Sequence, residues 1–293
     1  MDDLPQEIES AARAAGAITG TTTLAGVIGW PVEQSLSPVI HNAAYAALGL
    51  DWVYVPLPVG PDSLLTALAG LRAMGFAGAN VTMPHKEEAA TASATLSEDA
   101  ELVGAVNSLV FGAERLEGHN TDVAGFARFL EQDAGFDPAG RSIVVYGAGG
   151  AARACIAAVV RGGAVRATVV VRDLKKGEGL LAERLADRAE LHVASWNDPP
   201  PRGADLFVNA TPVHGDLLPL PPLHAGQLVV DLLYRPTVTP LVARARETGA
   251  SAFTGLGMLL HQAALSFELW TGYVPPLDVM SAAALAELGP AAA

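Results

Sequence analysis

One lysine and one aspartate in this chain could together transfer a proton. Lys86 lies in NVTMPHKEEAA (80–90), where a strand-like NVT passes into an expected helix. Asp122 lies in GHNTDVAGF (118–126), beside another expected helix start. Lysine acts as a general acid or base when burial or a neighbouring group tunes it. A solvated lysine and a common Asx or Thr helix cap explain the same residues without chemistry, so both interpretations stay open.

A glycine-rich turn predicts a dinucleotide site. In IVVYGAGGAARA (143–154) an apolar strand runs directly into the G-x-G-x-x-G/A spacing. Gly147 permits the tight turn, Gly149 lets the backbone approach a pyrophosphate, and Ala152 lets helix and strand pack closely. The helix that follows offers unpaired N–H groups and a positive dipole end to phosphates. A plain strand–helix turn is the alternative.

The end of the next strand favours NADP over NAD. An acidic residue at this place binds the ribose hydroxyls of NAD, whereas a basic residue accommodates a 2′-phosphate. The sequence reads VVVRDLKK, which puts Arg172 at the strand end, followed by Lys175 and Lys176. The planar guanidinium matches phosphate geometry. Asp173 complicates this prediction, because its carboxylate could face a ribose, and a solvated basic helix start is the alternative.

Two serines before an expected helix could bind a carboxylate. In QSLSP (34–38), Ser35 and Ser37 stand two residues apart, so in extended backbone both side chains face the same way. An ordinary N-cap serine ahead of Pro38 explains Ser37 equally well.

Several enzyme classes are excluded or disfavoured by the motifs that are missing. None of the five tyrosines has a lysine four residues later, the pair that short-chain dehydrogenases use. The sequence contains no H-E-x-x-H and no zinc-type Cys/His spacing, so we expect no metal site. Its single cysteine, Cys155, excludes an intramolecular disulfide.

The composition describes a folded, acidic protein. The 293 residues are 51% hydrophobic and 17% charged, with a formal net charge of −13. Nucleic acids and anionic membranes attract cationic surfaces, so neither is an expected partner. The acidic start MDDLPQEIES lacks the layout of a signal peptide, and no apolar run approaches the roughly 18 residues of a membrane span. We expect a cytoplasmic protein with a small-molecule substrate.

The elements that must position these residues alternate between strand and helix, which predicts an α/β fold with parallel sheets. Helical patterns cover 37–50, 62–75, about 86 onward, 122–134, 178–190, 258–272 and 277–289, with a further Ala-rich helix within 1–20. Strand patterns cover 24–29, 51–59, 77–82, 141–146, 167–172, 191–195, 205–211, 227–234 and 251–255, with a hairpin over 107–120.

Taken together and in order, the motifs resemble one family, the shikimate dehydrogenases. The resemblance extends over residues 24–272 and rests on SLSPVIHN, NVTMPHK, GAVNS, GHNTDVAGF, GAGGAARA, NATP, DLLYRPTVTPL and GLGMLLHQAALSFELWTG. It implies NADPH-dependent reduction of 3-dehydroshikimate to shikimate, a step of aromatic amino-acid biosynthesis. It also implies two domains, an N-terminal α/β substrate-binding domain with a mainly parallel sheet and a C-terminal Rossmann-like NADP-binding domain.

The resemblance also implies a role for individual residues. Lys86 and Asp122 would be the catalytic pair. The substrate would contact Ser35, Ser37, Thr82, Lys86, Asn107, Asp122, Tyr234 and Gln262. NADP would contact Gly147, Ala148, Gly149, Gly150, Ala151, Arg172, Asn209, Ala210, Thr211, Gly255 and Met258.

The sequence departs from the family pattern at a few positions. Gln34 stands where the family usually has histidine, and glutamine can form hydrogen bonds but cannot titrate. Pro212 replaces the serine of NATS and removes an N–H near the cofactor. Asp173 places a negative charge close to the expected phosphate. These departures leave an NAD-dependent quinate/shikimate dehydrogenase as the alternative function, and a non-catalytic NADP sensor as a second one.

The expected domain division follows from the motif order. Residues 1–121 plus 258–293 form the substrate-binding domain, and residues 122–257 form the dinucleotide domain, with the active site between them. The sequence indicates no particular oligomeric state, and a homodimer is one assembly that it allows.

Overall fold

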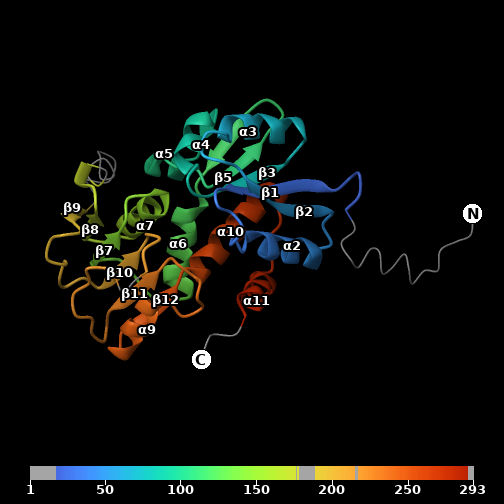
Figure 1. The fold of residues 1–293 in the computed structure, drawn as a ribbon. Helices are drawn as coiled ribbons and strands as arrows, with labels where there is room; N and C mark the ends of the chain where they lie inside the picture. Colours follow the sequence, from blue (N-terminus) through green and yellow to red (C-terminus); the bar gives the residue numbers. More distant parts are fainter. Residues whose placement is uncertain (1–17, 176, 178–188, 215–216, 290–293) are drawn as a thin grey trace, which may run out of the picture.

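The chain builds two six-stranded sheets from residues far apart in the sequence (Figure 1). The structure is a computed structural model that describes residues 18–175, 177, 189–214 and 217–289. The helix patterns expected within 1–20 and 178–190 lie almost wholly outside this range. In the described part of the chain, no helix has the length and apolar character needed to cross a membrane.

The first sheet has the strand order β2-β1-β3-β5-β6-β4. Strands β2, β1 and β3 run parallel, whereas β5 is antiparallel to both β3 and β6. The elements of this half are β1 Thr23–Gly29, α2 Ser37–Ala47, β2 Trp52–Pro58, α3 Leu64–Ala73, β3 Gly78–Val81, α4 Lys86–Ala92, β4 Thr95–Leu96, α5 Glu98–Val103, β5 Ser108–Phe111 and β6 Leu116–His119.

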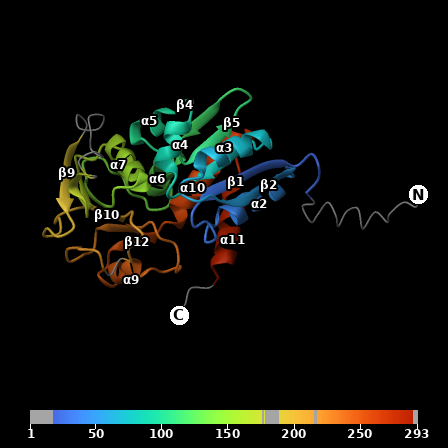
Figure 2. The same ribbon diagram turned by 45° about the horizontal axis from the view of Figure 1, so that its top comes forward.

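Both faces of this sheet are covered, which explains the apolar run of β1. Ala25 and Val27 point into the core shared with α2, α10 (Leu256–Thr271) and α11 (Leu277–Leu288), whereas Ile28 faces the core shared with α3 and α4. Successive residues of a strand point to opposite faces of the sheet. A strand that is buried on both faces is therefore apolar throughout, instead of alternating between apolar and polar residues. The helices lie on either side of the sheet in two views (Figures 1 and 2).

The second sheet is parallel throughout, with the order β12-β11-β10-β7-β8-β9. Ile143 and Val145 of β7 pack on the side of α6 and α7, while Val144 and Tyr146 pack on the side of α9. The elements of this half are β7 Ser142–Tyr146, α7 Gly150–Arg161, β8 Arg166–Val171, β9 Glu190–Ser195, β10 Leu206–Asn209, β11 Leu228–Asp231, α9 Pro240–Glu247 and β12 Ser251–Thr254.

Two helices connect the sheets. Helix α6 (Thr121–Gln132) leads from the first sheet to the second, and α10 (Leu256–Thr271) leads back, followed by α11 (Leu277–Leu288). They pack closely, because a Cβ at Gly125 of α6 would lie 2.8 Å from the Cβ of Gln262 on α10. Helix α10 crosses the centre of the molecule, with the two sheets on either side (Figure 1).

The α/β class and the two-sheet organisation predicted from the sequence are confirmed, and three local predictions are wrong or incomplete. The helix beginning at Lys86 ends at Ala92 rather than continuing through the Ala-rich stretch. Helix α5 then begins after Ser97, whose side chain accepts a hydrogen bond from the Ala100 amide. Helix α9, which begins at Pro240 after the cap residue Thr239, was not anticipated.

Candidate active site

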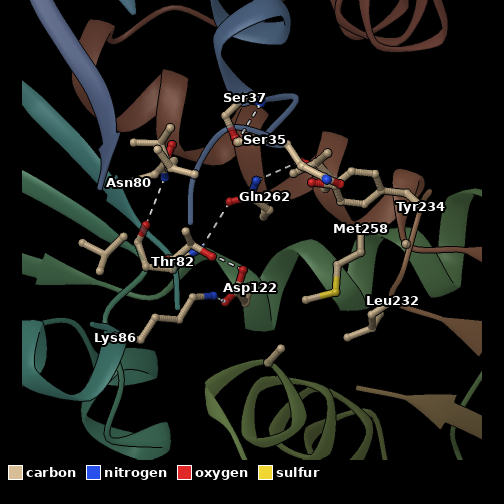
Figure 3. A pocket seen from close by; sticks show the side chains of 18 of the residues that line it. Ser35, Ser37, Asn80, Thr82, Lys86, Asp122, Leu232, Tyr234, Met258 and Gln262 are labelled. Atoms are coloured by element: carbon tan, nitrogen blue, oxygen red, sulfur yellow. Dashed lines mark hydrogen bonds and ion pairs between the residues drawn. The ribbon is translucent and has the colours of Figure 1, made fainter. Parts of the chain in front are cut away.

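A cavity of about 330 Å³ lies where residues of both halves meet. It brings together all eight side chains that the family resemblance assigns to the substrate, and it includes Ala151, Gly255 and Met258 of the expected cofactor set. Its lining residues are Val27, Pro31, Val32, Gln34, Ser35, Ser37, Asn80, Val81, Thr82, Lys86, Asn107, Asp122, Ala151, Leu232, Tyr234, Gly255, Met258, Leu259 and Gln262. Figure 3 shows Lys86 at one end of this cavity and Ser35 with Ser37 at the other.

Lys86 and Asp122 form an ion pair inside the cavity. The Lys86 Nζ donates to Asp122 Oδ2 at 2.5 Å, with side-chain exposures of 19% and 7%. Lys86 is the first residue of α4, and Asp122 is the second residue of α6. The expected Asx cap is present but belongs to Asn120, whose side chain accepts from the Asp122 and Val123 amides. Because Asn120 caps the helix, the Asp122 carboxylate is not used as the cap and pairs with Lys86 instead.

Asn107 holds this carboxylate from the other side. Its Nδ2 donates to Asp122 Oδ1 at 2.8 Å and to Thr121 Oγ1 at 2.9 Å, while its Oδ1 accepts from the Thr121 amide at 2.7 Å. Gln262 Oε1 lies 3.2 Å from the same Nδ2. Buried polar groups that are satisfied in this way fix one geometry, because breaking any bond leaves a partner unpaired.

The other end of the cavity suits an anion. The N-cap residue of α2 is Leu36, whose side chain forms no capping hydrogen bond, so the alternative of Ser37 as an N-cap is wrong. The Ser37 amide donates to Ser35 Oγ at 3.2 Å, which brings the two serines together. Hydroxyls beside the first amides of a helix are a favourable site for a carboxylate. Tyr234 lies close by, and burial raises the pKa of its phenol, which keeps it a neutral hydrogen-bonding group.

The glycine turn next to the cavity fits a dinucleotide. Gly147 has φ +120°, and a Cβ there would lie 2.8 Å from the Ala210 carbonyl oxygen. Gly149 caps α7 without a side-chain hydrogen bond, and nothing lies within 4 Å of the position of a Cβ. The first amides of α7 therefore face open space that a pyrophosphate could fill. Ala148, Gly150 and Ala151 complete this turn.

The end of β8 leaves its arginine available. Arg172 is exposed, and so are Asp173 and Lys175. Asp173 Oδ1 accepts from the Lys175 amide at 3.1 Å, so this carboxylate caps its own turn. Asp173, the acidic residue that complicated the NADP prediction, therefore already has a hydrogen-bond partner within its own turn. Lys176 lies outside the described residues.

Asn209 has a different place from its neighbours Ala210 and Thr211. It is buried, and its Nδ2 donates to Asp231 Oδ1 at 2.9 Å and to the Val213 carbonyl at 3.0 Å. Its Oδ1 accepts from the Thr211 hydroxyl at 2.7 Å. Asn209 therefore holds the loop that follows β10, beside Gly147.

Two polar residues in this region were not assigned a site role from the sequence. Asn80 lines the cavity, and its Oδ1 accepts from the Tyr54 hydroxyl at 2.7 Å. Ser266 is fully buried, and its Oγ accepts from Asn80 Nδ2 at 2.9 Å and lies 3.1 Å from Thr121 Oγ1. Ser266 stands one turn after Gln262, and this spacing on the same helix was the available signal.

Comparisons with known proteins match two separate segments of the chain to family models. A family model described as "Shikimate dehydrogenase substrate binding domain" matches residues 27–109, and one described as "Shikimate 5'-dehydrogenase C-terminal domain" matches residues 255–285. The "Shikimate dehydrogenase (NADP(+))" of Geobacter sp. (strain M21) is 44% identical over 284 residues, covering 92% of this chain and 97% of the relative.

Solved structures agree with the sequence relatives. A shikimate dehydrogenase in complex with NADP+ superimposes with a TM-score of 0.82 at 33% identity, covering 93% of this chain and 98% of the other. The shikimate 5-dehydrogenase of Thermus thermophilus, in complex with NADP(H) and shikimate, gives 0.77 at 33% identity, with coverages of 90% and 98%.

Proposed function

This chain belongs to the shikimate dehydrogenase family, and we propose that it catalyses the reversible, NADPH-dependent reduction of 3-dehydroshikimate to shikimate. The observation that carries the proposal is the cavity in which the Lys86–Asp122 pair faces Ser35 and Ser37 beside the glycine turn of α7. A small ring that bears a carboxylate at one end and a ketone at the other matches this distribution of groups.

The two serines at the start of α2 would bind the substrate carboxylate. The hydroxyls of the ring would reach Thr82, Asn107, Asp122 and Gln262, which line the opposite part of the cavity. Tyr234 would close the carboxylate end as a neutral hydrogen-bonding group. This polarity fixes which end of the substrate approaches Lys86.

Proton transfer would fall to Lys86. NADPH, when bound, supplies the hydride that adds to the ketone carbon. The Lys86 ammonium, directly or through a water that it orients, would deliver a proton to the oxygen that becomes the new hydroxyl. Asp122 would hold the ammonium in place and accept a hydrogen bond from a neighbouring substrate hydroxyl. The positive charge of Lys86 would also stabilise the developing alkoxide.

The cofactor would lie along the second half of the chain. The turn Gly147–Ala151 would cradle the pyrophosphate, and Arg172 would bind the 2′-phosphate. Ala210, Thr211, Gly255 and Met258 would line the path toward the nicotinamide, with Asn209 supporting the loop.

We also propose the corresponding domain division, with residues 1–121 plus 258–293 binding substrate and residues 122–257 binding the dinucleotide. The buried core residues on the two faces of the first sheet come from 1–121 and 258–293, and those on the α9 side of the second sheet come from 122–257, which supports this division. A homodimer and a cytoplasmic location stay predictions, and sedimentation velocity tests the first.

Turnover assays test the function. We expect NADP+ reduction with shikimate to be far faster than NAD+ reduction with quinate. The opposite preference would support the quinate/shikimate alternative, and cofactor binding with no turnover of either acid would support the sensor.

A further inference from the structure

Arg153 connects the dinucleotide helix to the helix that carries Lys86. It lies in the second turn of α7, and its Nη2 is 2.9 Å from Glu87 Oε1. Its Nη1 donates to the Val103 carbonyl at the end of α5, at 3.4 Å. Because Glu87 directly follows Lys86 in α4, this ion pair joins two elements that come from different halves of the chain.

Gly150 brings the same two helices into direct contact. A Cβ at Gly150 would lie 3.2 Å from Cδ and 3.6 Å from Cβ of Lys86, and 3.4 Å from the Cβ of Ala105. The aliphatic part of Lys86 therefore packs against the first turn of α7, where a residue without a side chain permits the close approach. The amides expected to bind the pyrophosphate and the ammonium expected to deliver the proton thus share one packed junction.

The contacts of Arg153 distinguish it from a simple phosphate ligand. A basic residue near the start of a dinucleotide helix could bind a phosphate directly. Here two guanidinium nitrogens already have a carboxylate and a carbonyl as partners, and only 25% of the side chain is exposed. These two interactions already orient the guanidinium toward α4 and the end of α5, and a phosphate would have to compete with the Glu87 carboxylate for the same charge.

We propose that Arg153, through Glu87, is a positioning residue that sets the place of α7 relative to Lys86, and therefore of the hydride donor relative to the proton donor. The proposal rests on the function proposed above. Hydride and proton must reach adjacent atoms of one carbonyl, and displacements of about 1 Å at such a site can reduce turnover by about a hundredfold.

Single and paired substitutions test this role. We expect Arg153→Ala and Glu87→Ala each to lower kcat about tenfold, with little change in KM for shikimate, whose proposed ligands largely lie in the other half of the molecule. The double variant should be no slower than either single variant, because both remove the same interaction. The exchanged pair Glu87→Arg with Arg153→Glu should recover part of the loss.

Two matched controls separate positioning from general effects of charge. Glu88 is the next acidic residue of α4, and its nearest partner is His85 at 4.0 Å. Arg161 lies two turns along α7 and pairs with Glu98 and Asp99 of α5. We expect Glu88→Ala and Arg161→Ala to leave kcat unchanged within about twofold, since the ion pairs of Glu88 and Arg161 are made with groups other than Glu87, Lys86 and the glycine turn.

Three further measurements distinguish positioning from a structural or ligand role. The primary isotope effect on kcat with deuterated NADPH should rise in Arg153→Ala, because misalignment slows hydride transfer itself. The dissociation constant of NADPH, from fluorescence titration, should change by less than about threefold. A double-mutant cycle on the Tm of the protein without cofactor should show coupling between Arg153 and Glu87.

The outcomes are distinguishable. If Arg153→Ala bound NADPH tenfold more weakly while Glu87→Ala kept the NADPH affinity and kcat of the unsubstituted enzyme, Arg153 would be a ligand of a cofactor phosphate. That result would overturn the proposal. Additive losses of kcat, or no loss, would overturn it as well. No turnover of shikimate by the unsubstituted enzyme would instead contradict the proposed function.

Discussion

Lys86 and Asp122 lie 36 positions apart in the sequence, yet their charged groups meet at 2.5 Å in the cavity. Each begins a different helix, and each of these helices follows a strand of the first sheet. The pair is therefore held between the first turns of two helices that follow strands of the same sheet. This arrangement leads directly to the first prediction.

Replacing Lys86 with alanine should remove turnover more than binding. We expect kcat for shikimate oxidation to fall roughly a hundredfold to ten-thousandfold, the usual contribution of a positioned general acid or base. The dissociation constant of shikimate should change much less, because the carboxylate end of the cavity is intact. Stopped-flow and equilibrium titration measure the two quantities. Nearly intact turnover would show that Lys86 is not the proton carrier.

Removing the Asn107 side chain should affect both stability and catalysis. Asn107→Ala leaves the buried Thr121 amide and one Asp122 oxygen without their partner. An unsatisfied buried polar group costs about 1–3 kcal/mol, so the midpoint of urea denaturation should fall. The value of kcat should also fall, because Asp122 loses its orientation. Unchanged stability would contradict the role assigned to this hydrogen-bond network.

The first two glycines of the turn should respond in opposite ways to alanine. Gly149→Ala meets open space at φ −80°, so the protein should fold normally while the new methyl group occupies the pyrophosphate cradle and weakens NADPH binding. Gly147→Ala is strained at φ +120° and meets the Ala210 carbonyl, so it should lower Tm. Thermal unfolding and fluorescence titration of both variants compare these effects. Equal loss of Tm would refute the distinction.

Arg172 should decide the preference for NADP. Arg172→Ala should raise KM for NADP+ about tenfold or more and leave KM for NAD+ nearly unchanged, because only the 2′-phosphate loses a charged partner. Asp173→Ala is the matched control. Its carboxylate already caps the Lys175 amide, so its removal should change the ratio of the two KM values only slightly. A reversal to NAD preference in Asp173→Ala would show that the carboxylate acts on the cofactor.

His41 should make the protein less stable in mild acid. It is fully buried and stacks on Tyr54 at 4.3 Å, and burial lowers its pKa to about 3, against a smaller opposing contribution from Asn80. Between pH 6.5 and about 3 the unfolded chain binds a proton that the folded chain does not, so stability falls as the pH falls. By about pH 5 the loss reaches about 2 kcal/mol.

His41→Phe keeps an aromatic ring in the stack and removes the titration. We expect the dependence of unfolding free energy on pH to flatten between about pH 6.5 and about pH 4 in this variant. The urea denaturation midpoint, measured across this range for both proteins, gives the comparison. Parallel curves would mean that His41 does not carry the acid sensitivity.

The sequence predicted the parts of the site that depend on local spacing. Short sequence patterns located three features correctly. These are the strand–glycine–helix turn from Ile143 onward and the ends of the strands that precede Lys86 and Asp122. The contacts of Asn107, Ser266 and Arg153 join elements up to 186 residues apart. Such contacts depend on how the sheets and helices pack, and no spacing within one segment reports them.

The local errors have the same origin. Alanine favours helix, so the Ala-rich stretch after Lys86 predicted one long helix. The fold instead ends the helix at Ala92, pairs Thr95 and Leu96 with β6, and starts again at the Ser97 cap. Ser97, followed by Glu98 and Asp99, was a signal in the sequence for the start of a new helix. Whether the chain starts a new helix there or continues the previous one depends on the pairing of Thr95 and Leu96 with β6.

The return of the chain through α10 has a consequence for biosynthesis. The core beneath β1 and α2 includes Leu260, Phe267 and Met280, which follow every strand of the second sheet in the sequence and leave the ribosome after them. The first sheet therefore cannot bury that face until these residues have emerged, whereas the strands from β7 to β12 form one continuous segment that emerges earlier. Folding during synthesis should thus complete the nucleotide-binding half first, although it begins more than a hundred residues into the chain.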